Sequence, residues 1–400
     1  MPSEAELLER IDEMRRVTVR GRVKAIVDAT LANLRRVDAL SPATLARPHP
    51  EGSGPAYVVS AGPGLDRNAS GLRWAKGTVF AVNSAIPALR RRGIEPDVGV
   101  TLEHMDFSSH LAEVPLLAVD ISAHPAAWDA AIRCGRGVWF GGGSPHALRM
   151  QRTIGVPPLL YSGGVSTAAF ALAAQWGFDP IVLVGQDLAY DLGRGRSYAE
   201  GSGWAGLEVR RDGGRLLFEG APERDTAHAA AKIPLVPRDR DGIAVPGWHG
   251  GEVWTTLEFY AQRLWLSQMA PRVKARCINA TESGARIPGW EHVSLRDVVA
   301  TAGRARGVDL AAPASEAKRD QALDEIRAEA RHAVALADWF LGDGSGPLPE
   351  AREMPLVGGL ASGDMLGVKE LKLDPDAALF AQYECYRAAA LHVLKVVGDG

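Results

Sequence analysis

Six short apolar runs, each followed by glycine or polar residues, constrain this chain more than any other feature of its sequence. The runs are Tyr57–Ser60, Thr78–Val82, Val98–Leu102, Leu116–Val119, Val138–Phe140 and Ile181–Val184. Helical patterns lie between them, as expected for parallel strands that are buried on both faces. The predicted fold is therefore an α/β fold, a Rossmann-like, doubly wound and mostly parallel sheet.

The segments that flank this pattern are predicted to be helical appendages. Residues 1–50 carry apolar residues at helical spacing from residue 4 onwards, and a linker rich in Pro and Gly follows from Pro42 to Pro55. Residues 301–400 carry one helical stripe that starts at Leu323 and a second from Asp374 to about Val397. We expect these stripes to pack in the core or to join copies of the chain in a homo-oligomer. Residues 51–300 would form the nucleotide-binding transferase domain.

Further elements are expected after the fifth run. An Ala-rich helix is predicted over Val165–Trp176, and the glycine-rich loop that follows Gly185 is typical of a ligand loop or lid. Leu207–Val209 and Leu216–Phe218 flank Asp212-Gly213-Gly214, which predicts a hairpin. A helix around Trp254–Met269 and a strand near Arg276–Asn279 complete the pattern.

Charge and composition exclude several classes of function. The chain has 45 Lys and Arg against 48 Asp and Glu, so a nucleic acid is not an expected partner. Its three cysteines lie far apart, which argues against a thiolate metal site or a disulfide framework. No signal peptide is evident, and no apolar stretch approaches the length of about 18 residues that a spanning helix needs. The protein is therefore expected to be cytoplasmic, without a membrane span.

The residues that follow the six runs are the candidate site. Ligands of open parallel sheets bind outside the carboxyl ends of the strands. In chain order these ends carry Ser60 with Gly62-Pro63-Gly64, then Asn83-Ser84, Glu103-His104, Asp120 with His124, Gly141-Gly142-Gly143-Ser144, and Gly185-Gln186-Asp187. Their convergence predicts one shared crevice.

The first turn indicates a phosphate ligand rather than a dinucleotide. The N–H groups of Gly62 and Gly64 could approach a phosphate, although a plain strand-to-helix turn fits the same residues. Arg67 stands where the third glycine of the dinucleotide fingerprint belongs. The second run ends in Asn83 instead of an acid, which disfavours NAD and leaves an amide for a ribose or a base edge. No P-loop sequence is present.

Other residues near the predicted crevice offer groups for binding and catalysis. Gly164, Ser166 and Thr167 open a predicted helix with N–H and hydroxyl donors. Glu103 and Asp187 could position hydroxyl groups or bind a divalent cation, and His249 could remove a proton from an acceptor. The order Ser166, Asp187, His249 also fits a serine hydrolase, but no long strand leads into Ser166.

Read in order, six segments resemble a known family, the motility accessory factor glycosyltransferases of bacterial flagellin and the MptE-like 6-hydroxymethylpterin diphosphokinases. The segments are Val58–Leu65, Ala81–Ala85, Gly93–Asp97 followed by Thr101–Glu103, Ser162–Thr167, Gly185–Tyr190 and Asn279–Ala285. The layout is also similar to metal-independent bacterial sialyltransferases, in which a histidine acts as base. Gly64 departs from the serine that is usual in the first turn, the chain is shorter than many members, and the flanking helices differ.

The resemblance implies a function and assigns roles to residues. It implies an inverting glycosyltransferase whose donor is a nucleotide-activated sugar, such as a CMP-nonulosonic acid, and whose acceptor is a protein or glycan such as flagellin. Nucleotide and donor would contact Gly62, Pro63, Gly64, Asn83, Ser84, Gly164, Ser166, Thr167, Gln186, Asn279, Thr281 and Gly284. Glu103, Asp187 and His249 would face the transferred group and the acceptor, and no cofactor would be required.

Two alternatives remain open at this point. The first is an MptE-like, ATP-dependent diphosphokinase that uses the same crevice, with Mg²⁺ held by Asp97, Glu103 or Asp187. The second is a non-catalytic protein that binds nucleotides or carbohydrates.

Overall fold

A nine-stranded parallel sheet forms the centre of the protein. The computed structural model describes residues 3–48, 54–142, 151–152, 154–220, 239–301, 308–309, 313, 315–341 and 387–397. In spatial order the strands are β1 (Ser41–Pro42), β7 (Gly137–Phe140), β6 (Leu116–Asp120), β5 (Val98–Thr101), β4 (Thr78–Val82), β3 (Ala56–Val59), β8 (Ile181–Val184), β14 (Cys277–Asn279) and β15 (Glu291–His292). All neighbouring pairs in this sheet are parallel. The predicted α/β fold is confirmed, with strand ends within one or two residues of the predicted ones.

The order of the strands fixes where a ligand can bind. From β3 the chain moves outwards through β4, β5, β6 and β7, and then returns to β8 on the other side of β3. Val59 at the end of β3 is in register with Val184 at the end of β8. The connections that leave these two ends run in opposite directions, and such a switch point opens a crevice in doubly wound sheets.

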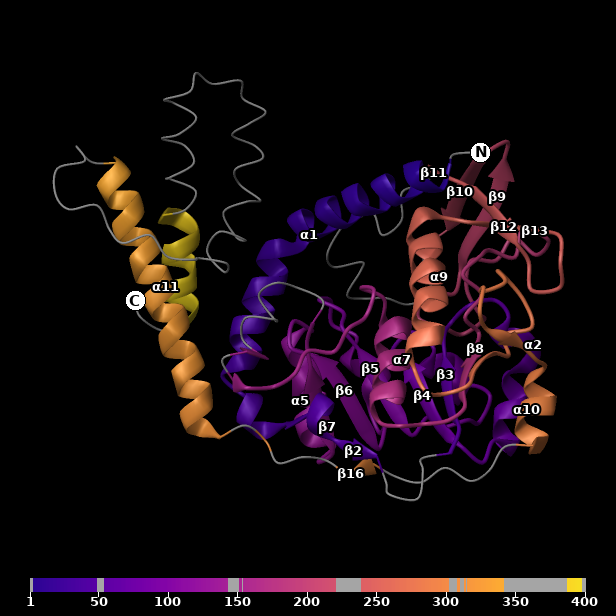
Figure 1. The fold of residues 1–400 in the computed structure, drawn as a ribbon, viewed down its shortest axis with the longest axis horizontal. Coiled ribbons are helices and arrows are strands. Elements are labelled where there is room, and N and C mark those ends of the chain that lie inside the picture. The colour runs from indigo at the N-terminus through magenta and orange to yellow at the C-terminus, as the bar shows by residue number, and fades with distance from the viewer. Residues whose placement is uncertain are drawn as a thin grey trace.

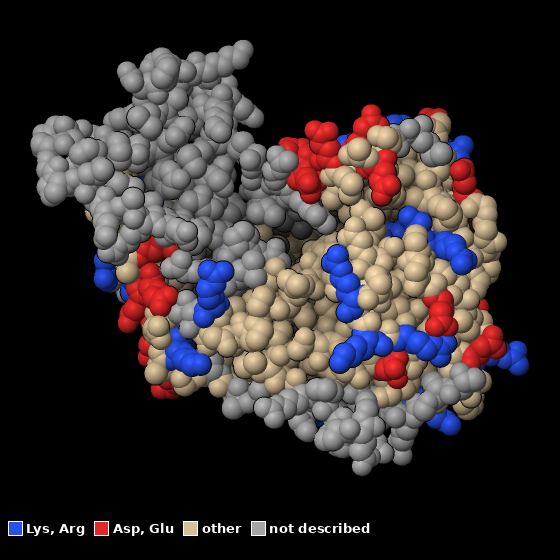
Figure 2. Space-filling model, in the orientation of Figure 1, with Lys and Arg blue, Asp and Glu red and all other residues tan. Residues whose placement is uncertain are grey.

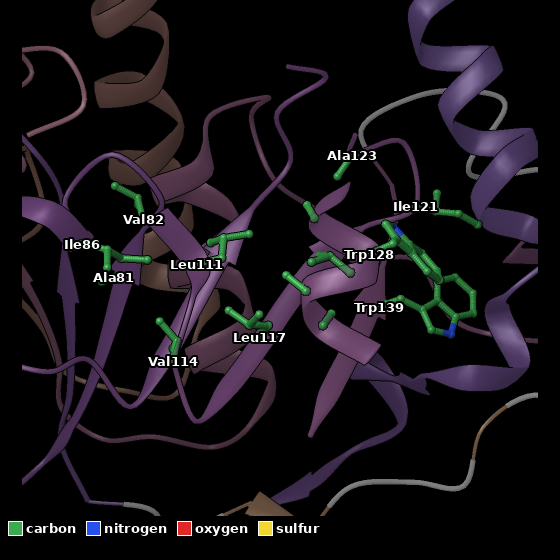
Figure 3. Packing of buried hydrophobic residues seen from close by; sticks show 14 of the residues in the cluster. Ala81, Val82, Ile86, Leu111, Val114, Leu117, Ile121, Ala123, Trp128 and Trp139 are labelled. Carbon is green, nitrogen blue, oxygen red and sulfur yellow. The ribbon is translucent and has the colours of Figure 1, made fainter. Parts of the chain in front are cut away.

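The sheet is buried on both faces, because alternate residues of each strand enter different cores. Tyr57, Val59 and Val184 face one core, which also contains Trp128 and Trp139. Figure 3 shows part of this cluster, in which α3 (Ile86–Arg90) and α5 (Pro125–Arg133) cover the sheet. The alternate residues, among them Val58, Phe80 and Leu183, pack beneath α7 (Val165–Gln175) and α9 (Leu257–Met269) on the opposite face. Figure 1 shows these two helices in front of the sheet.

The N-terminal helix α1 (Glu4–Leu34) joins distant parts of the chain. A capping box of Ser3 and Glu6 starts the helix. Near its other end, the amide of Asn33 donates to the carbonyls of Ile121 and Ala123, at 2.9 and 2.7 Å. Residues 387–397 form a helix that lies between α1 and α11 (Glu316–Leu341) in Figure 1. Its His392 contacts Asp28 of α1, and its Arg387 pairs with Asp338 of α11.

The predicted C-terminal helices are confirmed at α11 and at residues 387–397, and the N-terminal segment begins with the predicted helix. That segment is not wholly helical, however, because Ser41–Pro42 pairs with β7 in the main sheet and Arg47–Pro48 pairs with Val308–Asp309. Residues 374–386 lie outside the described ranges.

Small antiparallel sheets complete the fold. One contains β9 (Leu207–Asp212), β10 (Arg215–Gly220) and β11 (Asp239–Asp241), and confirms the predicted hairpin. Others pair β12 (Ile243–Pro246) with β13 (Glu252–Thr255), and β2 (Arg47–Pro48) with β16 (Val308–Asp309). Trp254, expected to open a helix, lies in β13, because the run Val253–Thr255 pairs with Ile243–Val245.

The remaining helices are short connections around the sheet. They are α2 (Leu65–Asn68), α4 (Ser108–Leu111), α10 (Leu295–Thr301) and the 3₁₀ turns Val37–Ala39, Ala43–Leu45, Ala69–Trp74 and Ala270–Arg272. Within the described part of the chain, no helix is long and apolar enough to cross a membrane. On the face shown in Figure 2, basic and acidic side chains are interspersed, and acidic ones gather along its upper edge.

Candidate functional site

A cavity of about 260 Å³ lies at the switch point between β3 and β8. Its walls come from the tips of four strands, from the start of α7, from the loop between β8 and β9, and from α9. Of the predicted residues it brings together Gly62, Pro63, Ser84, Glu103, Gly164, Ser166, Gln186 and Asp187. A cavity therefore lies where the crevice was predicted, but of the strand ends only those of β3, β4, β5 and β8 border it. It is not bordered by Asp120 at the end of β6, by His124 in the loop that follows, or by Gly141 after β7.

The Gly62–Gly64 turn shapes the cavity but has no spare backbone donor. The N–H of Gly62 donates to the carbonyl of Gly185 at 2.8 Å. The N–H of Gly64 donates to both carboxylate oxygens of Asp187, each at 3.0 Å. Pro63 has no N–H to offer. The structure thus corrects the prediction that these backbone groups bind a phosphate, because their hydrogen bonds are already made inside the protein.

Asp187 joins this turn to the loop that follows β14. Its side chain is buried and accepts a short hydrogen bond from the hydroxyl of Ser283 in addition to the bonds from Gly64. Next to it, the N–H of Gln186 donates to the hydroxyl of Thr281 at 3.0 Å. Burial raises the pKa of Asp187 to about 6, and the bonds from Ser283 and Gly64 oppose that rise. These contacts make Asp187 and Thr281 supports of the cavity wall.

Gly185 must be glycine for the wall to close, and this can be tested by substitution. Its φ is +65°, and a Cβ there would lie 2.3 Å from the carbonyl oxygen of Ser60. We expect Gly185→Ala to lower the free energy of unfolding by about 2 to 4 kcal/mol, from backbone strain together with overpacking. Gly213 in the β9–β10 turn is the matched control, since its φ is +56° but no atom lies within 4 Å of the added Cβ. Gly213→Ala should cost only about 1 kcal/mol, and equal losses in urea unfolding would contradict the close contact.

The start of α7 presents backbone donors to the cavity. Gly164 caps this helix without a side-chain hydrogen bond, and Gly163 to Ser166 border the cavity. No acceptor among the described residues binds the N–H groups of Val165 and Ser166. Unpaired N–H groups and the helix dipole together favour an anion. The hydroxyl of Ser166 makes one long bond, 3.4 Å, to Gln262 Oε1.

Thr167 supports this helix start rather than the cavity. Its hydroxyl donates to the carbonyl of Gly164 at 2.7 Å and accepts from the N–H of Ser162 at 3.1 Å, and its side chain is fully buried. The prediction that Thr167 offers its hydroxyl to the donor is therefore wrong for this arrangement of the loop.

Glu103 is the carboxylate that remains available in the cavity. It follows β5 and is half-buried, and no hydrogen bond or ion pair engages its carboxylate among the described residues. Asp187 also borders the cavity, but both of its oxygens are occupied. Asn83 is buried between Val82 and Ser84, which border the cavity, while Asn83 itself does not.

An aromatic wall was missed from the sequence. Tyr198 and Trp204 stack with their ring centroids 5.8 Å apart and an interplanar angle of 25°, and both border the cavity together with Phe259. Burial raises the pKa of Tyr198 to about 12, so its hydroxyl remains a donor at neutral pH. The polar, glycine-rich loop after β8 indicated a ligand loop, but no periodic pattern in it predicted which side chains point inward.

His249 lies in a second cavity, of about 300 Å³, which also contains Arg67, Asp191, Trp248 and Gly284. Its Nε2 bonds to the carbonyl of Glu282 at 2.9 Å, and its side chain is exposed. The structure therefore does not bring His249 together with Glu103. Asp187 borders both cavities and separates them as a shared, buried wall.

Two other predicted groupings are not assembled. Asn279 is buried outside both cavities, where its Oδ1 accepts from the N–H of Thr281. Asp97 precedes β5 and accepts from the N–H of Val79 at the opposite end of the sheet, so it cannot share a metal with Glu103. The described residues contain no group of three His, Cys, Asp or Glu side chains that could hold a metal ion.

The serine hydrolase alternative also fails on geometry. Ser166 lies inside α7 without a preceding strand, and its hydroxyl contacts Gln262 rather than a histidine. Asp187 and His249 are each held by other partners.

Comparisons with known proteins agree with this architecture. The family model described as 6-hydroxymethylpterin diphosphokinase MptE-like matches residues 28–193. Among solved structures, the MAf glycosyltransferase from Magnetospirillum magneticum AMB-1 aligns with a TM-score of 0.53 at 15% identity, over 94% of this chain and 57% of that chain. This chain thus spans little more than half of that glycosyltransferase. A search of curated proteins found no match.

The resemblance seen in the sequence is therefore confirmed, since the chain contains an MptE-like domain and shares its fold with a MAf glycosyltransferase. Both names denote enzymes of group transfer. The matched region 28–193 includes the strand tips from β3 to β8 that form the first cavity, whereas the Asn279–Ala285 segment lies outside it.

Proposed function

We propose that this chain is a glycosyltransferase that binds a nucleotide-activated sugar in the first cavity and transfers the sugar to an acceptor hydroxyl. The observation that carries the proposal is the composition of that cavity. The N–H groups at the start of α7 and the carboxylate of Glu103, which have no partner among the described residues, border the same space as an aromatic wall. The N–H groups suit the phosphate of such a donor, and the carboxylate suits the acceptor hydroxyl.

The proposed reaction is a displacement at the anomeric carbon of the sugar with inversion. The N–H groups of Val165 and Ser166 would hold the phosphate and stabilise the charge that builds on it as it leaves. Glu103 would accept the proton of the attacking hydroxyl. The bond from the anomeric carbon to the phosphate breaks, and the acceptor oxygen takes its place. A nonulosonic acid linked to cytidine monophosphate is the proposed donor, and a protein or glycan such as flagellin is the proposed acceptor.

A second candidate, an ATP-dependent diphosphokinase, is favoured by the family match over residues 28–193. Magnesium in such enzymes is bound by one or two carboxylates together with substrate phosphates, so Glu103 alone could contribute to it. No cofactor is needed for the glycosyltransferase, whereas Mg²⁺ would be essential to the kinase.

Binding of nucleotides separates the two candidates. A ligand present at about one hundred times its Kd stabilises the folded state by about 2.7 kcal/mol. We expect CMP and CMP-sugars to raise the melting temperature in the presence of EDTA, and ATP with Mg²⁺ to raise it less. A shift that requires Mg²⁺ and is larger for ATP would favour the kinase. The absence of any shift with every nucleotide would contradict both enzymes and favour a binding protein of another kind.

A further inference from the structure

The stacked pair Tyr198 and Trp204 is the part of the first cavity whose purpose the proposed reaction leaves open. The two rings lie on the loop between β8 and β9, with centroids 5.8 Å apart. We infer that this pair is a stacking platform that selects donors by a planar heteroaromatic ring. The inference rests on the proposed function and deepens it, because it names the part of the donor that is recognised there.

The platform is fixed to the loops that follow two strands. The N–H of Ala199 donates to the carbonyl of Ala61 after β3, at 2.8 Å. The N–H of Gly203 donates to the carbonyl of Ser84 after β4, at 3.0 Å. One anchor follows Tyr198 and the other precedes Trp204, so the rings are held at the rim of the cavity. A preorganised surface loses less conformational entropy when a ligand binds.

The cavity combines two kinds of binding group. The start of α7, whose first N–H groups have no acceptor in the described part of the chain, borders the same space as the two rings. An anion joined to a flat ring, as in a nucleoside phosphate, would use both ends. A sugar phosphate without a base would satisfy only the α7 end.

The platform by itself discriminates little among nucleobases. Every nucleobase has a π-face, so stacking on an aromatic ring is worth about 1 to 3 kcal/mol per base with little preference among bases. Ser197, next to Tyr198, is 2% exposed, and its hydroxyl has no hydrogen-bond partner among the described residues. It borders the cavity as well. The platform thus supplies affinity for a ring, and the Ser197 hydroxyl is the polar group beside it that a ring edge could engage.

The test compares ligands with and without a ring, in the full chain. Calorimetry would measure the affinities of CMP, AMP and ribose 5-phosphate for the wild type, for Trp204→Leu and for Trp204→Phe. We expect Trp204→Leu to weaken the binding of CMP and AMP about ten- to hundredfold and to leave the binding of ribose 5-phosphate unchanged. Trp204→Phe, which keeps a ring, should restore most of the affinity. Leu retains apolar bulk, and the melting temperature of each variant would confirm that it folds.

Each contrary result has its own meaning. If the wild type binds ribose 5-phosphate as tightly as CMP, the platform inference is overturned while the phosphate end of the proposed function stands. If Trp204→Leu weakens ribose 5-phosphate as much as CMP, the ring acts only on the shape of the loop, and the inference is again overturned. If no phosphate ligand binds the wild type, the proposed function itself fails.

Discussion

Replacing Glu103 by Gln should lower the rate of transfer by about a hundredfold to ten-thousandfold, the range that a general base contributes. The carboxylate borders the first cavity and has no partner among the described residues, so the substitution removes a proton acceptor without breaking a contact. Binding of CMP should change little, because Glu103 is assigned to the acceptor hydroxyl and not to the nucleotide. Steady-state kinetics should therefore show a fall in kcat with a nearly constant KM for the donor.

Two further variants make this prediction specific. Glu95→Gln removes an exposed carboxylate that pairs with Arg90 at 3.0 Å, and surface pairs of this kind contribute little to stability. It should leave kcat unchanged. His249→Gln tests the second cavity. If it abolishes turnover while Glu103→Gln remains active, then His249 is the base, and the second cavity rather than the first holds the acceptor.

The sheet could be predicted from the sequence because its strands are buried on both faces. Runs such as Ile181–Val184 must be apolar throughout, and they stand out against the polar turns that follow them. The rule that ligands bind at the carboxyl ends of parallel strands then placed Glu103 and Ser84 at the cavity without any knowledge of contacts.

The use of each polar group could not be predicted in this way. Gly64 and Asp187 are 123 residues apart, and the sequence contains no sign that the carboxylate would occupy the N–H of the turn. His249 follows β12, and the way in which β12 pairs with β13 directs it into the second cavity. Such pairings depend on tertiary contacts between loops, which have neither the period of a helix nor that of a strand.

The stability of the protein should depend on pH through the protonation of Asp187. Burial raises the pKa of this carboxyl in the folded protein from 3.8 to about 6. Because the folded pKa is the higher one, the folded state holds the proton more tightly than the unfolded chain. The resulting stabilisation is fully present below about pH 4 and is lost as the pH rises through 6. A shift of about two pKa units corresponds to about 3 kcal/mol.

Asp187→Asn isolates this contribution, since Asn does not titrate and still offers an oxygen to the N–H of Gly64. In urea unfolding, the stability of Asp187→Asn relative to the wild type should rise by about 3 kcal/mol between pH 4 and pH 7. Other ionisable groups cancel in this difference between two proteins measured at the same two pH values. A relative stability that is constant across this range would mean that the carboxylate is solvated, and hence that the wall between the two cavities is open.

Ser283→Ala provides an independent check on the sign. The hydroxyl of Ser283 donates to Asp187 and lowers its pKa against the effect of burial. Removing the hydroxyl should therefore raise the pKa of Asp187 further and move the pH at which stability is lost to a higher value. Movement to a lower pH would contradict the assignment of this donor. The direction of that shift thus tests whether one buried carboxylate, held by Gly64 and Ser283, closes the cavity in which we propose that transfer occurs.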